Sequence, residues 1–296
     1  MSAIDDSEGG LSKSETARQL AKTGFEDLAQ HLQRGDSKQL TAFLAAMGRF
    51  HRYSFGNVML IIAQQPDATR VAGFRTWLSL GRQVRKGEKG IVIVAPVRVK
   101  WRAKERPGGN EDDPDESVVR FKATHVFDIA QTEGEPLPEL ARVGGDPAGF
   151  LDRLRGVVHE EGITLEERDD LGGAEGVSMG GAIHVRAGLS PAETFSVITH
   201  ELAHELMHKV NAEERPTKTV RETEAEAVAH VVCSAVGLET NAAAADYIRL
   251  YRGDAETLTQ SLDRIQKTAA RIIEGVLEEG HTEDVRHAAA SRERSR

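Results

Sequence analysis

The pentapeptide His200-Glu201-Leu202-Ala203-His204 constrains the fold of this chain more than any other stretch. Because a helix completes a turn every 3.6 residues, the two histidines lie on one helix face, with Glu201 directly after the first. Imidazoles from successive turns are suited to binding zinc, and the glutamate is placed to take a proton from the attacking water. The motif therefore predicts a helical metal site with His200 and His204 as ligands and Glu201 as the general base.

The residues before the motif predict where this helix begins. Ser190 is a typical capping residue, Pro191 suits the first helical position, and Glu193 completes a capping box. Residues 181–186, just upstream, predict a short strand. A strand followed by a metal-binding helix is typical of zincin-type peptidases, in which an edge strand holds an extended peptide.

The third protein ligand has to come from outside the pentapeptide. His208 continues the four-residue spacing, but it lies about 12 Å along the helix axis from His200 and is interpreted as a polar residue of the last turn. Position 210 is valine, which excludes the extended motif with three histidines.

The acidic segment 221–228 supplies the next candidates. Glu224 lies in helical phase with the apolar positions 228, 231, 232 and 235, and a carboxylate in an apolar stripe needs a partner such as a metal. Glu224 is therefore the predicted third ligand, with Glu226 as the alternative. A solvated acidic helix start remains a further interpretation.

Length and composition favour two globular domains. The chain has 296 residues, of which 39% are hydrophobic and 29% charged. No run of 18 apolar residues occurs and the first residues are acidic, so we expect no membrane span, no secretory signal and a cytoplasmic protein. The single cysteine, Cys233, lies in an apolar stretch and is interpreted as a core residue.

Charge is unevenly distributed along the chain. The formal net charge is −9, yet between Arg70 and Lys104 ten basic residues stand against one acidic residue, Glu88. Such asymmetry indicates a local site for a polyanion within an acidic molecule. The net charge of −9 argues against a protein that coats nucleic acid with a uniformly basic surface.

Aromatic residues are interleaved with this positive charge, and the turn 85–90 is both basic and glycine-rich. Aromatic rings stack on unpaired bases while arginine and lysine follow the phosphates, so the pattern predicts a platform for single-stranded DNA without sequence preference. The alternative is that Phe74 and Trp77, three residues apart on a helix, belong to the core. The residues predicted to contact DNA are Tyr53, Asn57, Arg70, Arg75, Trp77, Arg82, Arg85, Lys86 and Lys89.

Periodicity and turn signals predict an α+β protein. We expect helices at 14–33, 37–50, 57–65, 75–80, 150–161, from 191 through the histidine motif, 242–251 and 255–278, and strands at 91–95, 118–127, 163–165 and 181–186. The predicted domains are a DNA-binding domain at 14–137 and a metallopeptidase domain at 138–280. Residues 1–13 are expected to be disordered and 281–296 to form a flexible tail.

Four segments together resemble a known family. Residues 51–57, 68–77, 80–90 and 126–134 are similar to the N-terminal domain of ArdC-type antirestriction proteins, which occurs on conjugative plasmids and in plasmid primases. His200-Glu201-Leu202-Ala203-His204 with Glu224-Ala225-Glu226-Ala227 is similar to the metallopeptidase half of the same family.

The resemblance implies a two-domain protein that binds single-stranded DNA and carries a zincin-like domain, protecting incoming plasmid DNA from restriction. It implies His200, His204 and Glu224 as ligands of Zn²⁺, with Mn²⁺ or iron as alternatives, and Glu201 as the base of a peptidase. An unidentified protein, bound to DNA, is the expected substrate. The alternative function is a DNA-coating module, or a primase accessory, whose metal site is structural.

Overall fold

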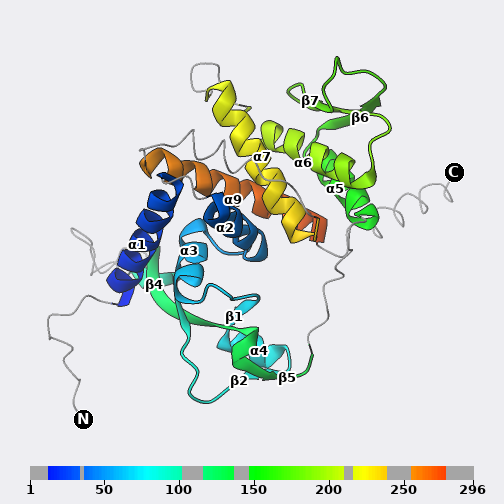
Figure 1. Cartoon of the computed structure of the whole chain (residues 1–296). Helices are drawn as coiled ribbons and strands as arrows, with labels where there is room; N and C mark the ends of the chain where they lie inside the picture. Colours follow the sequence, from blue (N-terminus) through cyan, green and yellow to red (C-terminus); the bar gives the residue numbers. More distant parts are fainter. Residues whose placement is uncertain are drawn as a thin grey trace, which may run out of the picture. The chain divides into compact units, whose positions relative to one another are not determined.

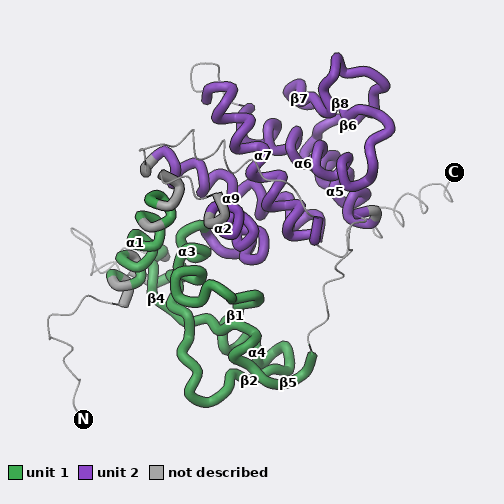
Figure 2. The backbone as a smooth tube through the Cα atoms, in the orientation of Figure 1, with its two compact units in different colours: residues 1–30, 55–138 green, residues 31–54, 139–296 purple. Residues whose placement is uncertain are grey.

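The computed structural model describes residues 13–33, 37–101, 116–136, 147–209, 216–238 and 255–277 (Figure 1). The chain forms two compact units, one of residues 1–30 and 55–138 and the other of residues 31–54 and 139–296 (Figure 2). Helices and strands occur in both units, which confirms the mixed α and β composition. Within the described ranges, no helix combines the length and apolar character needed to cross a bilayer.

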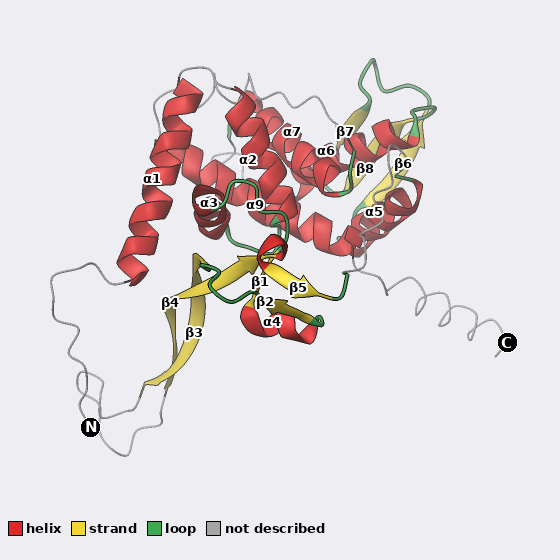
Figure 3. Cartoon of the chain, turned by 60° about the horizontal axis from the view of Figure 1, so that its bottom comes forward, coloured by secondary structure: helices red, strands yellow, loops and turns green. Residues whose placement is uncertain are grey.

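The first unit contains most of helix α1 and two small sheets. Strands β1, β4 and β3 form an antiparallel sheet in that order, and β2 pairs with β5. The long β3–β4 ribbon is drawn in yellow in Figure 3. The elements are α1 (Lys13–Gln33), α3 (Phe55–Gln64), β1 (Val71–Gly73), α4 (Phe74–Ser79), β2 (Arg82–Val84), β3 (Ile91–Trp101), β4 (Glu116–Asp128), the 3-10 helix η2 (Ile129–Gln131) and β5 (Thr132–Gly134).

Helix α3 covers the free edge of β3 with two side-chain amides. Asn57 donates to the carbonyl of Val94 and accepts from its N–H, both at 2.9 Å. Gln64, two turns later, makes the same pair of bonds with Val92, at 2.8 and 2.9 Å. An uncovered edge strand presents unpaired backbone groups to other chains, and these amides pair two of its residues.

The second unit is built from helices and one three-stranded sheet. Strand β8 is central, parallel to β6 and antiparallel to β7, so β7 is an edge strand. The elements are α2 (Ser37–Arg49), α5 (Ala148–Glu160), β6 (Thr164–Arg168), β7 (Gly176–Ser178), β8 (Ala182–Arg186), α6 (Pro191–Met207), α7 (Lys218–Ala235) and α9 (Ala255–Leu277).

Two glycines let helices of this unit approach closely. A Cβ placed on Gly48 of α2 would lie 2.7 Å from the carbonyl oxygen of Val231 on α7. A Cβ on Gly275 of α9 would lie 2.6 Å from a methyl group of Val157 on α5. Helix α7 is buried along most of its length, and Cys233 is part of this core, where burial raises the pKa of its thiol to about 12.

Most predicted elements are present. The expected strand 91–95 is longer, ending at Trp101, and β1, β2, β5 and β7 are short strands that the sequence pattern did not indicate. The predicted helix 242–251, residues 1–12 and the tail 281–296 lie outside the described residues, whereas Lys13 begins helix α1.

Candidate metal centre and nucleic-acid interface

Helix α6 begins as the sequence predicts. The Ser190 hydroxyl accepts from the N–H of Glu193, whose carboxylate accepts from the N–H of Ser190 at 2.8 Å. Pro191 is the first helical residue. The helix runs through both histidines and ends at Met207, so His200 and His204 project from successive turns of one regular helix.

The two histidines converge on a third side chain from helix α7. The Nε2 atoms of His200 and His204 lie 3.1 Å apart, and Glu222 Oε2 lies 3.5 Å from each of them. One ligand atom from each residue falls within a span of 4.8 Å. Among the described residues this is the group of three whose donor atoms are close enough to share an ion.

The donor set fits a divalent cation. Ligand nitrogens about 2.1 Å from a tetrahedral zinc ion lie about 3.4 Å apart, close to the 3.1 Å between the two imidazoles. Two imidazoles and one carboxylate are the protein ligands of many hydrolytic zinc sites. The side chain of Glu222 is 48% exposed, so this side of the centre is open to solvent and to a substrate.

Glu226 lies one turn after Glu222 and contacts the other nitrogen of His200. Its Oε2 is 3.5 Å from His200 Nδ1, which leaves Nε2 facing His204. Burial lowers the pKa of His200, but Glu226, Glu201 and Glu222 outweigh burial and raise the pKa above 6.5. Burial and the neighbouring His200 lower the pKa of His204 to about 4, so His204 is neutral at physiological pH.

Glu201 lies buried between helix α6 and strand β7. A Cβ on Gly176 would lie 2.9 Å from Glu201 Oε1 and 2.6 Å from a methyl group of Val197, so only glycine fits there. Burial raises the pKa of Glu201, although His200 opposes the shift. A carboxyl group with a raised pKa beside an open metal centre has the properties of a general base and acid.

Glu205, one turn after Glu201, holds the loop that joins β7 to β8. Its Oε1 accepts from the Ser178 hydroxyl and the Gly180 N–H, and its Oε2 accepts from the Gly181 N–H, each at 2.7 Å. These three bonds fix the end of β7 to helix α6. Glu205 is not among the predicted site residues, although its place one turn after Glu201 is a usable signal.

Glu224 does not contact the His200–His204 pair, in contrast to the prediction that it is the third ligand. It is fully buried as predicted, but its Oε2 lies 3.0 Å from His208 Nε2, and its Oε1 accepts from the Ser261 hydroxyl at 2.6 Å and from Arg264. The carboxylate in line with the apolar stripe is thus satisfied inside the helix bundle. Glu222 falls outside the apolar stripe, is 48% exposed, and lies 3.5 Å from the Nε2 atom of each histidine.

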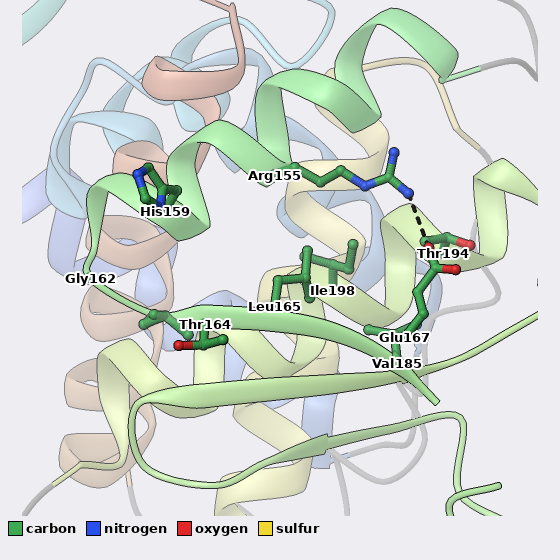
Figure 4. Close-up of a pocket in the computed structure, with 10 residues that line it drawn as sticks. Arg155, His159, Gly162, Thr164, Leu165, Glu167, Val185, Thr194 and Ile198 are labelled. Atoms are coloured by element: carbon green, nitrogen blue, oxygen red, sulfur yellow. Dashed lines mark hydrogen bonds and ion pairs between the residues drawn. The ribbon is translucent and has the colours of Figure 1, made fainter. Parts of the chain in front are cut away.

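A separate cavity of about 630 Å³ lies among α5, β6, β8 and α6 (Figure 4). Arg155 and Glu167 form an ion pair at 3.3 Å, and Ile198 is part of the apolar lining. Neither His200 nor His204 lines this cavity. The metal centre is therefore identified by its donor atoms and not by this cavity.

Two residues predicted to contact DNA have structural roles in the first unit. Trp77 is 1% exposed and its indole N–H donates to the carbonyl of Phe127 at 2.9 Å, so it cannot stack on a base. Phe74, which the sequence favoured less, is 46% exposed. The amide of Asn57 is occupied by Val94, as described above.

Arg85 holds the basic turn in place, and Arg82 joins strand β2 to residues 132–135. Arg82 donates to Thr132 and to the carbonyls of Gly134 and Glu135, while Arg85 donates to Glu88 and to the carbonyls of Ala130 and Thr132. Both guanidinium groups therefore use most of their donors in hydrogen bonds within the first unit.

Other predicted contacts remain accessible. Arg75, Lys86 and Lys89 are exposed and Arg70 is half-buried. Tyr53 belongs to the second unit, where burial raises the pKa of its hydroxyl. Lys86 and Lys89 therefore lie exposed on a turn that hydrogen bonds from Arg85 and Gln131 hold in place.

Exposed apolar side chains lie near this turn. Phe74, Leu78 and Leu80 are 46%, 50% and 45% exposed, on and directly after the short helix α4. A fourth exposed apolar side chain, Phe121 at 59%, lies further along the β3–β4 ribbon, where β4 pairs Phe121 with Pro96. Apolar side chains left in water beside lysine and arginine fit a surface that meets the flat faces of bases.

Comparisons with known proteins match the N-terminal part of the chain to a known domain family. Residues 18–127 match the family model of the N-terminal domain of anti-restriction factor ArdC. An uncharacterized protein of Bacillus anthracis is 24% identical over 281 aligned residues, which cover 80% of this chain and 47% of that protein. The chain thus spans about half the length of that curated relative.

Solved structures of the antirestriction protein ArdC from plasmid R388 are also similar. The metal-free structure is 21% identical, with a TM-score of 0.47, and the match covers 76% of this chain and 85% of that chain. The Mn(II)-bound structure is 21% identical, with a TM-score of 0.46, and the match covers 86% of this chain and 99% of that chain.

Proposed function

Because the chain is of the ArdC antirestriction type, with the ArdC N-terminal domain at residues 18–127, we propose that it binds single-stranded DNA without sequence preference and carries a metal-dependent peptidase site. The proposed biological outcome is protection of incoming mobile-element DNA, by coating it or by acting on proteins bound to it. Zn²⁺ is the proposed cofactor, with Mn²⁺ as the alternative.

The observation that carries the peptidase proposal is the convergence of His200, His204 and Glu222 beside buried Glu201. A bound divalent cation supplies Lewis acidity to a substrate carbonyl and to water. Glu201, with its raised pKa, accepts the proton of the attacking water and returns it to the leaving amine. Glu226 keeps the imidazole of His200 turned toward the shared position.

Strand β7 is the proposed docking edge for the peptide. It is an edge strand of its sheet, and Gly176 on it lies against Glu201. An extended peptide that adds to such an edge gains main-chain hydrogen bonds along its length. The hydrogen bonds from the loop after β7 to Glu205 hold the edge rigid for that purpose.

Replacing Glu201 with glutamine tests the peptidase. The variant keeps the volume of the side chain and loses the base, so we expect unchanged zinc content and unchanged DNA affinity with loss of cleavage of DNA-bound protein. If the variant still protects DNA from restriction as well as the wild type does, the working activity is DNA coating and the metal centre is structural.

The double change Lys86→Ala and Lys89→Ala tests the DNA surface. Each phosphate contact on a single strand contributes about 0.7 to the slope of log affinity against log salt, so the double variant should lose about 1.4. The control removes Lys218 and Lys267, two exposed lysines of the second unit, and changes net charge equally. Equal slopes for both double variants would reject the basic turn as a phosphate contact.

A further inference from the structure

Beyond the metal ligands, the structure contains a row of buried hydrogen bonds that starts at His204. The Nδ1 atoms of His204 and His208 lie 3.0 Å apart, and the Nε2 atom of His208 lies 3.0 Å from Glu224 Oε2. Glu224 accepts in turn from the Ser261 hydroxyl and from Arg264. The row thus connects helices α6, α7 and α9 inside the second unit.

The direction of these bonds follows from the chemistry of the end groups. When Nε2 of His204 faces a metal it carries no proton, so the remaining ring proton is on Nδ1 and has to be donated. The nearest acceptor is His208 Nδ1. His208 then carries its own proton on Nε2, where it donates to the Glu224 carboxylate.

The far end of the row is fixed as a carboxylate. Glu224 Oε1 accepts from the Ser261 hydroxyl and pairs with the Arg264 guanidinium, which leaves Oε2 to His208. His208 is 2% exposed and Glu224 is fully buried, so water does not compete for these bonds. A charged acceptor that is held on both oxygens imposes one tautomer on the imidazole that faces it.

We propose that His208 and Glu224 are positioning residues that hold His204 in the tautomer with Nε2 free for the metal. This inference rests on the metal site proposed above. It gives the buried Glu224 a role toward the centre without direct ligation. For His200, a single residue takes the place of His208 and Glu224, because His200 Nδ1 faces the Glu226 carboxylate directly.

Nitrogen NMR of the zinc-loaded wild-type protein tests the row without any substitution. Long-range proton–nitrogen correlations distinguish the two tautomers of a neutral imidazole. We expect His204 to be protonated on Nδ1 and His208 on Nε2. A zinc-loaded protein in which His208 is protonated on Nδ1 would overturn the proposal, because His208 then offers no acceptor to His204.

Two substitutions of His208 test the energetic consequence. His208→Leu removes the acceptor and should weaken zinc binding about 10- to 100-fold, the usual effect of losing an outer-shell partner. His208→Gln keeps an amide oxygen as acceptor and should recover most of the affinity. The zinc dissociation constant is measured by competition with a chromophoric chelator, and thermal melting without metal reports folding.

Ser261→Ala is the matched control within the same cluster. It removes one bond to Glu224 but leaves the contact with His208, so we expect a lower melting temperature with unchanged zinc affinity. A folded His208→Leu variant with wild-type zinc affinity would reject the positioning role of His208 but leave the proposed metal site standing. If the wild-type protein binds neither zinc nor manganese, the proposed metal site fails and the row fails with it. If His208→Leu does not fold, the NMR result on the wild type decides.

Discussion

The side-chain amide of Asn57 forms both of its hydrogen bonds with the backbone of Val94, at 2.9 Å each. In effect, one residue of helix α3 replaces a neighbouring strand at the edge of the β1–β4–β3 sheet. Asn57 was predicted to contact DNA, whereas its bonds to Val94 give it a structural role. The difference leads to a testable expectation.

Replacing Asn57 with alanine should destabilise the protein without changing the DNA affinity of the folded form. Two backbone groups of Val94 lose their partners, and an unsatisfied group costs about 1–3 kcal/mol where water does not replace the bond. Urea denaturation measures the free energy of unfolding, and an oligonucleotide titration measures affinity. Weakened DNA binding with unchanged stability would show that Asn57 is a contact residue after all.

Phe74 and Trp77 should behave in opposite ways. Phe74→Ala removes an exposed ring and should weaken binding of oligothymidine by about 1–3 kcal/mol, with little change in stability. Trp77→Phe leaves the Phe127 carbonyl without its donor and should lower stability, with little change in affinity. Fluorescence anisotropy of a labelled oligonucleotide measures affinity. Leu80→Ala is the control, because it removes equally exposed apolar surface that has no ring to stack.

Glu222 and Glu226 of α7 should contribute unequally to metal binding. Glu222→Ala removes a proposed ligand and should weaken zinc binding by more than about 100-fold, since outer-shell changes alone cost about 10- to 100-fold. Glu226→Gln should fall within that outer-shell range. Equilibrium dialysis with metal analysis measures both, and Glu175→Gln, at an exposed ion pair, is the control. Zinc retention by Glu222→Ala would remove Glu222 from the ligand set.

The metal-free stability difference between the wild type and Glu224→Gln should depend on pH. The folded protein holds the pKa of Glu224 below 4.5, so the unfolded chain binds more protons between the two pKa values. The stabilisation is therefore complete well above pH 4.5 and decreases as pH falls through 4.5 toward the folded pKa. Chemical denaturation in the presence of a chelator, from pH 7 to 3.5, measures it. A stability difference that stays constant over this pH range would contradict a lowered pKa of Glu224 in the folded protein.

Gly48 and Gly156 should respond oppositely to alanine. A Cβ on Gly48 would meet the Val231 carbonyl at 2.7 Å, so α2 and α7 would have to separate, at a cost of about 1–3 kcal/mol. A Cβ on Gly156 of α5 meets no atom within 4 Å, so alanine there should stabilise the helix by about 0.5–1 kcal/mol. Thermal melting compares the two variants. A neutral Gly48→Ala would show that the helices do not depend on this close approach.

Local signals predicted much of the fold and part of the metal centre. The capping box Ser190–Glu193, the course of α6 and the common face of His200 and His204 all depend on residues within a few turns of one helix. Helical geometry fixes such relations whatever surrounds the helix. The burial of Glu224 was predicted for the same reason, since phase with an apolar stripe is a property of α7 alone.

The partner of each side chain was decided by tertiary structure. Glu222, Glu224 and Glu226 lie within two turns of α7, and only the rotation of that helix against α6 and α9 selects which one faces the histidines. Likewise, the position of α4 on its sheet buries Trp77 and exposes Phe74. The sequence by itself determined a helix with two histidines, its base and a nearby acidic helix. The packing of residues distant in sequence determined which glutamate faces the Nε2 atoms of both histidines, because rotation between helices depends on contacts such as Gly48 with Val231 that no local periodicity contains.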